Sequence, residues 1–290
     1  VLPKSNSGQF QVRISDADGT RIEKTEQNVL KTLDVLYELV GKENVSISST
    51  MVGIHGSQYS TNPIYLFMAG PQDALLQVAL KRDYEVDMDE LKDAFRQKMK
   101  EALPGVALSF EPIELTDKIL SQGSPTPIEV KVLSKNKKQN EEYAYKVIDK
   151  LKQIPYLRDV KLGSAIHAPA ISINIDRVKA AQLGTNLTNI SRALVAATSS
   201  SRFTEKNIWV DPKLSLSYSV AVQVPITEMK SINDIAEIPV APNSARPVLS
   251  DVATIKMDTI YGENDNIGSM PVLSVTANLY KKDLGTATKE

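Results

Sequence analysis

Apolar and polar residues follow two different rhythms along this chain, and the rhythms recur in the same order. Phe10, Val12 and Ile14 occupy every second position, which is the spacing of a strand with one buried face. Residues 22–40 then place apolar side chains at helical spacing, and residues 45–49 return to the spacing of a strand. This order of strand, helix and strand indicates a sheet with helices packed on it.

The first unit predicted by this pattern ends near residue 112. Extended segments are expected at 64–68 and 75–80, followed by a helix between 87 and 103 and a closing strand at 106–110. The order strand, helix, strand, then strand, helix, strand is that of a ferredoxin-like sandwich, built from split βαβ units. The predicted fold class is therefore α+β.

Three helix starts have recognisable caps. Thr20 and Glu23 have the spacing of a capping box, in which a hydroxyl and a carboxylate bond the free amides of the first turn. Asp87 precedes the second helix of the first unit, and Pro104 ends it. Ser231 is expected to cap a short helix farther along the chain.

A second pattern of strand, helix and strand begins after a polar connector that ends at Pro127. Its first strand covers 128–132, its helical stripe runs from 144 to 154, and its next strand includes 160–162. Residues 171–175 then alternate apolar and polar side chains, which predicts a further strand with one buried face.

The pattern of predicted secondary structure changes after Thr198. The chain becomes β-rich and proline-punctuated, with one long alternating strand predicted at 216–224, and a strand suited to the earlier sheet returns only at Val272. We therefore expect a small domain inserted into the second unit. The predicted boundaries are 1–112 for the first unit, 113–198 with 272–290 for the second, and 199–271 for the insertion.

Composition excludes several classes of partner and site. Lys and Arg number 34 against 35 Asp and Glu, for a formal net charge of -1, so neither nucleic acid nor an acidic membrane surface is an expected partner. The chain has no cysteine, which excludes disulfides and thiolate metal sites. No segment reaches the roughly 18 to 20 uninterrupted apolar residues that a membrane-spanning helix requires.

The sequence also lacks the common catalytic motifs. It has no G-x-S-x-G nucleophile elbow, no H-E-x-x-H zinc motif and no glycine-rich phosphate loop. His55 and His167 stand alone in the sequence and are interpreted as loop residues. We therefore predict no enzyme, no cofactor and no resident metal ion, with a small hydrolase of the same fold as the rival interpretation.

Several stretches of this chain resemble the resistance-nodulation-division (RND) family of efflux pumps, of the acriflavine or multidrug type. They occur in the order that the large second periplasmic loop of that family has. The stretches are Leu2-Pro3 with Gly8, Phe10 and Val12, then Gly19-Thr20 with Glu23 and Thr25, then Ser124 to Val130, then Asn174 to Arg177 with Leu183-Gly184, and finally Ile238 to Val240 with Arg246 to Val248 and Asp251-Val252.

The resemblance implies two ferredoxin-like porter subdomains, with a docking subdomain inserted in the second, at the boundaries given above. It implies the periplasmic portion of an inner-membrane protein of a Gram-negative bacterium, with a second porter that continues past Glu290. The full-length pump would be a proton-driven antiporter and a homotrimer, with a periplasmic adaptor and an outer-membrane channel as partners. Its expected cargo is amphipathic compounds or drugs.

The resemblance also implies a gating loop. Residues 55–62 correspond in position to the glycine-containing loop that separates two drug pockets in multidrug members, and a polar loop with one aromatic residue suits a gate. The candidates here are His55, Gly56 and Tyr59. The loop has only this one glycine and no phenylalanine, and the alternative is an ordinary hairpin connection.

Residues on the strands near this loop are candidates for an apolar binding wall, because flexible and aromatic side chains suit varied ligands. They are Met51, Tyr65, Phe67 and Phe110. The alternative for each of them is a place in the hydrophobic core.

Two other functions stay open at this point. The heavy-metal branch of the same family would need several methionine thioethers for Cu(I) or Ag(I). Met51 and Met68 fall on neighbouring predicted strands, but Met99 falls on the buried stripe of a helix and no third ligand is evident. The other alternative is a stand-alone extracytoplasmic binding module.

Overall fold

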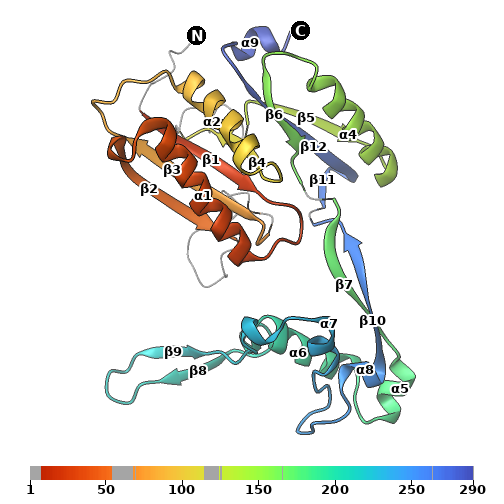
Figure 1. The fold of residues 1–290 in the computed structure, drawn as a ribbon. Helices are drawn as coiled ribbons and strands as arrows, with labels where there is room; N and C mark the ends of the chain where they lie inside the picture. Colours follow the sequence, from red (N-terminus) through yellow and green to blue (C-terminus); the bar gives the residue numbers. More distant parts are fainter. Residues whose placement is uncertain are drawn as a thin grey trace. The chain divides into compact units, whose positions relative to one another are not determined.

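The computed structural model describes residues 8–53, 68, 70–113, 124, 126–164, 166–262 and 264–289. The chain divides into two compact units (Figure 1). Unit 1 consists of Val1–Ala168 with Ile260–Glu290, and unit 2 consists of Pro169–Thr259. None of the helices in the described ranges is both long enough and apolar enough to cross a membrane.

The first part of unit 1 has the predicted ferredoxin-like order. Its elements are β1 (Gln9–Ser15), α1 (Ile22–Val40), β2 (Val45–Val52), β3 (Asp73–Leu80), α2 (Met88–Ala102) and β4 (Ala107–Glu111), with a short 3-10 turn at Lys42–Asn44. The strands form one sheet in the order β2-β3-β1-β4, and each neighbouring pair is antiparallel. The predicted α+β class is confirmed.

The core of this subdomain lies between the sheet and its two helices. Phe10, Val12 and Ile14 on β1 are at most 2% exposed, as the period of two predicts. Phe10, Phe95 and Phe110 pack together with ring centroids 5.8 to 6.4 Å apart, in tilted and edge-on arrangements. Full burial of each such ring is worth about 1.5 to 3 kcal/mol, so this cluster fixes α2 on the sheet.

The second part of unit 1 repeats part of the same pattern. Its elements are β5 (Ile128–Leu133), α4 (Lys137–Leu151), β6 (Leu157–Leu162), β11 (Asp265–Ile267), β12 (Met270–Leu279) and the short α9 (Leu284–Ala287). β12 pairs with β5 along one side, and with β6 and β11 along the other. The order β6-β12-β5 therefore matches β2-β3-β1 of the first subdomain.

Helix α4 covers one face of this second sheet. Ala144 and Ile148 on the helix pack against Leu273 and Val275 on β12, and all four are at most 6% exposed. Asn140, near the start of α4, donates to the carbonyl oxygen of Pro271 at 2.8 Å. The start of α4 thus lies beside the start of β12.

Unit 2 is a small body with a two-stranded stem. Its elements are β7 (Ala168–Ile175), α5 (Arg177–Gln182), α6 (Leu187–Thr198), β8 (Asn207–Val210), β9 (Ser217–Val220), α7 (Ile232–Ala236), α8 (Leu249–Val252) and β10 (Ala253–Ile260), with 3-10 turns at Ser201–Phe203 and Ile226–Glu228. β7 pairs with β10, and β8 pairs with β9 as a hairpin that extends from the helices (Figure 1).

The limits of this unit differ from the predicted insertion at 199–271. Ala180 on α5 and Ile190 on α6 pack with Val240, Leu249 and Val252 in one core, so both helices belong to unit 2. At the other end, β11 pairs with β12 in unit 1. Helical periodicity shows that a helix has a buried face, but it does not show which core covers that face.

Local predictions had mixed outcomes. The predicted capping box at Thr20 is wrong, because the hydroxyl of Thr20 donates to the carbonyl oxygen of Ala17 and Arg21 precedes α1 without a side-chain cap. Asp87 accepts from the backbone amides at the start of α2, at 2.9 and 3.1 Å, and Ser231 forms a capping box with Asp234. The long strand predicted at 216–224 is shorter, and the one predicted at 64–68 lies almost wholly outside the described residues.

Candidate functional site

The face of the first sheet that points away from α1 and α2 carries several charged and polar side chains, beside the apolar Leu75 and Met51. Successive side chains of a strand point to opposite faces, so the residues between Phe10, Val12 and Ile14 lie on this face. Strand pairing places their neighbours on β3 and β4 there as well. The polar residues of this face are Gln11, Arg13, Asp73, Gln77, Ser109 and Glu111. Taken as whole residues, Gln11, Arg13, Asp73 and Ser109 are buried.

Arg13 is the centre of this face. Its Nε atom donates to Oε1 of Glu111 at 2.6 Å, and both side chains are 6% exposed. Nη1 lies 4.0 Å from Oδ2 of Asp73 and 3.5 Å from the sulfur of Met68. A buried charge requires such partners, because an unpaired guanidinium or carboxylate would lose its hydration without compensation.

The two glutamines extend this network. Nε2 of Gln11 donates to Oε2 of Glu111 at 2.9 Å, and Nε2 of Gln77 donates to Oε1 of Gln11 at 2.8 Å. Both carboxylate oxygens of Glu111 are therefore bonded within the first sheet. In contrast, the hydroxyl of Ser109 is buried with no hydrogen-bond partner in the described part of the chain.

The second sheet also has a polar face, on the side away from α4. Val160 and Leu162 on β6 pack toward the helix, so Lys161 between them points the other way. Ser274 on β12 donates to Oε1 of Glu129 on β5 at 2.6 Å. This face therefore also carries charged and hydroxyl side chains.

The pKa of Lys161 depends on charged groups of both sheets. Burial lowers the pKa of its ammonium group below the usual 10.5, and the positive charge of Arg13 lowers it further. The carboxylates of Asp73, Glu111 and Asp159 act in the opposite direction. A lysine on β6 is thus held among charged groups that come from both sheets.

Asp159 on β6 connects the two subdomains directly. Its carboxylate accepts two hydrogen bonds from the guanidinium of Arg96 on α2, at 2.7 and 2.8 Å. It also accepts from the backbone amide of Phe110 at 3.2 Å and from Nδ2 of Asn278 at 2.8 Å. The Asp159 side chain is 4% exposed. Sequence reasoning missed this residue, whose partners lie 49 to 119 positions away.

Of the residues predicted to form an apolar binding wall, the structure describes Met51 and Phe110, and it places them on opposite faces of the first sheet. Met51 on β2 pairs with Leu75, which in turn pairs with Arg13, so Met51 lies on the polar face. Phe110 pairs with Val12 and points into the core, where it is 4% exposed. The core alternative therefore holds for Phe110. The predicted residues His55, Gly56, Tyr59, Tyr65 and Phe67 lie outside the described residues.

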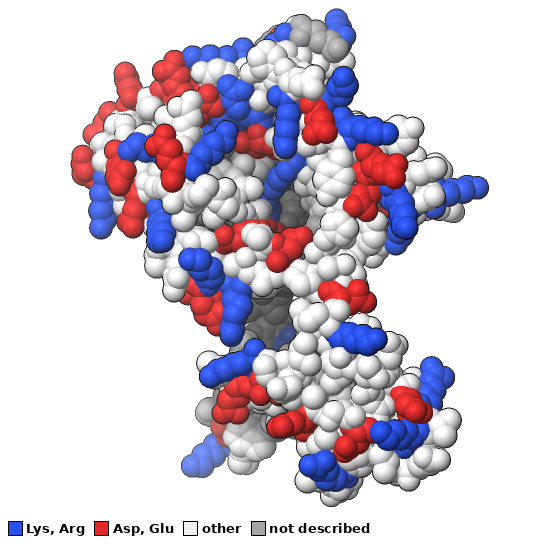
Figure 2. Space-filling model, turned by 45° about the vertical axis from the view of Figure 1, so that its right-hand side comes forward, with Lys and Arg blue, Asp and Glu red and all other residues white. Residues whose placement is uncertain are grey.

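The remaining candidates offer little chemistry. His167 is exposed, with Nε2 2.9 Å from Oε1 of Glu141. Met99 is 1% exposed in the core of the first subdomain. Across the described ranges, no three or more His, Cys, Asp or Glu side chains are grouped as a metal ion would require. On the face shown in Figure 2, acidic and basic side chains are interspersed.

Comparisons with known proteins agree with this architecture. A family model described as the AcrB/AcrD/AcrF family matches residues 1–290. The cobalt-zinc-cadmium resistance protein CzcA of Cupriavidus metallidurans is 24% identical over 199 residues, which is 65% of this chain and 18% of that protein. The cation efflux system protein CzcA of an Alcaligenes species matches with the same values.

Solved structures show the same fold. Two crystal forms of a heavy metal efflux pump match with TM-scores of 0.79 and 0.77, at 20% and 22% identity. The match covers 98% and 99% of this chain and 29% of each pump chain. The present chain thus spans less than a third of the length of these relatives.

These relatives also bear on the type of pump. The named relatives are metal-resistance and cation-efflux proteins, so they do not support the acriflavine or multidrug type that the sequence resemblance implied. A family model that covers the whole chain, together with two sheets in ferredoxin-like order, leaves one family assignment. The chain belongs to the AcrB/AcrD/AcrF family of RND efflux transporters.

Proposed function

We propose that this chain forms the porter and docking parts of a proton-driven pump that exports heavy-metal cations, with divalent ions of the cobalt, zinc and cadmium class as cargo. The two sequence relatives, which match 65% of the chain, are named as cobalt-zinc-cadmium resistance and cation efflux proteins, and this supports metal cargo over drugs. The chain would bind and pass the ion without chemical conversion, so no catalytic reaction is assigned to it.

The polar face of the first sheet is the observation that carries this proposal. A pocket for amphipathic compounds is lined mostly by apolar and aromatic side chains. This face instead carries Arg13, Asp73 and Glu111, and the aromatic ring of Phe110 points to the opposite side of its strand. Charged and amide side chains suit an ion better than a hydrophobic molecule.

The same residues favour divalent ions over Cu(I) and Ag(I). Carboxylate oxygens are regular ligands of Zn²⁺ and related ions, whereas soft monovalent ions select thioethers. Met99 is enclosed in the core, which leaves Met51 and Met68 near the polar face among the methionines considered. A divalent ion that approaches Glu111 or Asp73 would compete with the guanidinium of Arg13 for the same oxygens.

The setting of the whole protein is part of the proposal. We place this chain in the periplasm as part of an inner-membrane pump of a Gram-negative bacterium. The full-length protein would work as a homotrimer, with a periplasmic adaptor and an outer-membrane channel. Unit 2 would supply the docking surface for these partners.

Metal and drug tolerance of a gene-deletion strain tests the cargo. We expect deletion of the full-length gene to lower tolerance of zinc, cobalt and cadmium, and a plasmid copy to restore it. A copy with Glu111→Gln should restore less, whereas Glu38→Gln, on the exposed surface of α1, should restore fully. Sensitivity to copper or silver alone would favour soft-metal export, and sensitivity to amphipathic drugs alone would contradict metal export.

A further inference from the structure

Two buried oxygen atoms beside the loop that joins β1 to α1 accept no hydrogen bond in the described part of the chain (Figure 1). They are Oδ2 of Asp16, which follows the end of β1, and Oδ1 of Asn28, in the second turn of α1. Asn28 is 4% exposed. A buried acceptor without a partner costs free energy, so each of these atoms requires an explanation.

One hydrogen bond holds the two side chains together. Nδ2 of Asn28 donates to Oδ1 of Asp16 at 2.7 Å. This bond leaves the second carboxylate oxygen and the amide oxygen as acceptors on adjoining side chains. Neither a carboxylate nor an amide oxygen can donate, so these two atoms cannot satisfy each other.

The secondary structure fixes both residues. The backbone amide of Asp16 donates to the carbonyl oxygen of Gln72 at 3.0 Å, which ties the loop to the residue before β3. Asn28 lies on the buried face of α1 with Thr25 and Thr32, and the hydroxyl of Thr32 donates to the carbonyl oxygen of Asn28 at 2.7 Å. The acceptors are therefore held in place rather than carried on exposed side chains.

The loop beside these oxygens is acidic. Residues 16–19 read Asp-Ala-Asp-Gly, and Gly19 has a φ of 83°, the left-handed conformation that a tight turn requires. Burial and the negative charge of Asp73 raise the pKa of Asp18 above its usual 3.8, and His167 acts in the opposite direction. Such surroundings favour a cation over further negative charge.

We propose that Asp16 and Asn28 are ligands of a structural Ca²⁺ ion that fastens the loop between β1 and α1 to the helix. Carboxylate and amide oxygens are hard ligands, which Ca²⁺ binds at about 2.3 to 2.6 Å and soft ions do not select. Ca²⁺ takes about six to eight oxygens, so backbone carbonyl groups and water would complete the shell. Mg²⁺ fits less well, because it requires a regular octahedron and keeps most of its water.

This site differs from the proposed path of the cargo, and the inference does not depend on what the pump exports. An amide oxygen is one of its ligands, so it is not one of the groups of three or more His, Cys, Asp or Glu side chains that the described ranges lack. The sequence-based prediction of no resident metal ion would then be wrong.

Melting temperatures of the whole chain, measured after treatment with a chelator, test the site. Weak calcium sites of extracellular modules have dissociation constants of about 0.1 to 1 mM. At about 10 mM, Ca²⁺ should therefore raise the melting temperature by about 3 to 6 °C, and Mg²⁺ at the same ionic strength should raise it less. No rise with Ca²⁺, or an equal rise with Mg²⁺, would overturn the proposal.

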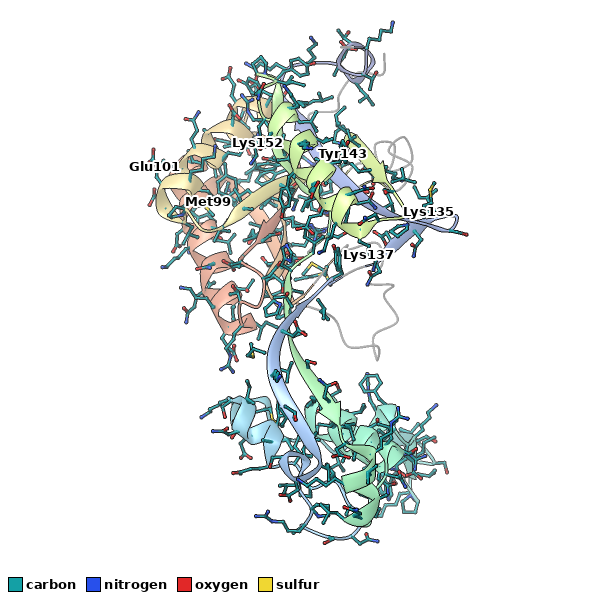
Figure 3. All side chains as sticks on the ribbon, turned by 90° about the vertical axis from the view of Figure 1, so that its right-hand side faces the viewer. Met99, Glu101, Lys135, Lys137, Tyr143 and Lys152 are labelled. Carbon is teal, nitrogen blue, oxygen red and sulfur yellow. The ribbon has the colours of Figure 1, made fainter. Side chains whose placement is uncertain are left out.

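Substitutions and a crystal structure locate the effect. Asp16→Asn keeps an acceptor for Asn28 but loses the charge, and should abolish the rise, whereas Asn28→Asp adds a second carboxylate and should enlarge it. The controls are Asp34→Asn on α1 and Glu101→Gln in the last turn of α2 (Figure 3), both exposed, and each should keep the full rise.

Crystals grown with Ca²⁺ should show the ion bonded to Oδ2 of Asp16 and Oδ1 of Asn28 at about 2.3 to 2.6 Å. A full rise that persists in Asp16→Asn, or a water molecule bonded to these two oxygens in place of the ion, would overturn the proposal.

Discussion

Arg13 and Glu111 show what the sequence could and could not predict about single residues. The alternation of β1 predicts that Arg13 lies opposite the apolar core, and this is where the structure has it. Its partner, however, lies 98 positions away on β4. A charged residue in a strand gives no signal of which distant carboxylate neutralises it, so the polar face was not predicted as a site.

Loss of the Glu111 carboxylate should destabilise unit 1. The variant Glu111→Ala removes the 2.6 Å ion pair of the buried Arg13 guanidinium, and breaking a buried pair in this way costs about 3 to 5 kcal/mol. Urea denaturation followed by circular dichroism measures the change. The double variant Arg13→Met with Glu111→Leu should recover most of it, and a loss as large as in the single variant would refute the pairing argument.

Asp93 on α2, which accepts hydrogen bonds from Arg158 on β6, gives the contact between the two subdomains of unit 1 a defined dependence on pH. Its hydrogen bond from Arg158, together with the charges of Arg158 and Arg96, holds the pKa of the carboxyl below its usual 3.8, although burial raises it. Because the folded-state pKa is the lower one, the stabilisation is complete above pH 3.8 and is lost as the pH falls through the folded-state value.

Melting temperatures across a pH series test this effect. The unsubstituted chain should melt higher than Asp93→Asn at neutral pH, and the difference should shrink as the pH falls below 3.8. Glu38→Gln serves as the control, because Glu38 is exposed in its pair with Lys98. A difference between wild type and Asp93→Asn that is constant down to the lowest pH would show that the carboxylate is not the cause.

At the scale of elements, the apolar periodicity of the sequence located most helices and strands. It failed in the β8–β9 hairpin, where the apolar side chains are exposed. The hairpin residues Ile208, Trp209, Tyr218 and Val220 are 44% to 55% exposed, so their apolar character does not mark a buried face. The strand predicted at 216–224 ends at Val220 for the same reason. Apolar alternation predicts strand length only when a core accepts one face.

The two predicted caps of the first subdomain provide an element-scale test. Asp87→Ala removes a side chain that accepts from two amides of α2, and loss of such a cap costs about 1 kcal/mol. Thr20→Ala should cost much less, since the Thr20 hydroxyl bonds Ala17 rather than the start of α1. The two variants can be compared by urea denaturation, and equal losses would contradict the observed start of α1.

At the scale of the whole molecule, the order of elements was enough to predict two ferredoxin-like subdomains and an insertion. The insertion at 199–271 stays a prediction, and the compact unit 2 seen in the structure also includes α5 and α6. The cargo could not be predicted from the fold, which different branches of the family share. The relatives and the polar face of the first sheet changed the proposal from drugs to metal cations.

Zinc transport by the purified full-length protein in proteoliposomes tests the central claim most directly. With a zinc-sensitive dye inside the vesicles, an imposed proton gradient should drive zinc movement that stops when the gradient is collapsed, and Glu111→Gln should slow it more than Glu38→Gln. Zinc movement no faster than in protein-free vesicles, in a preparation that still transports an amphipathic dye, would contradict the account.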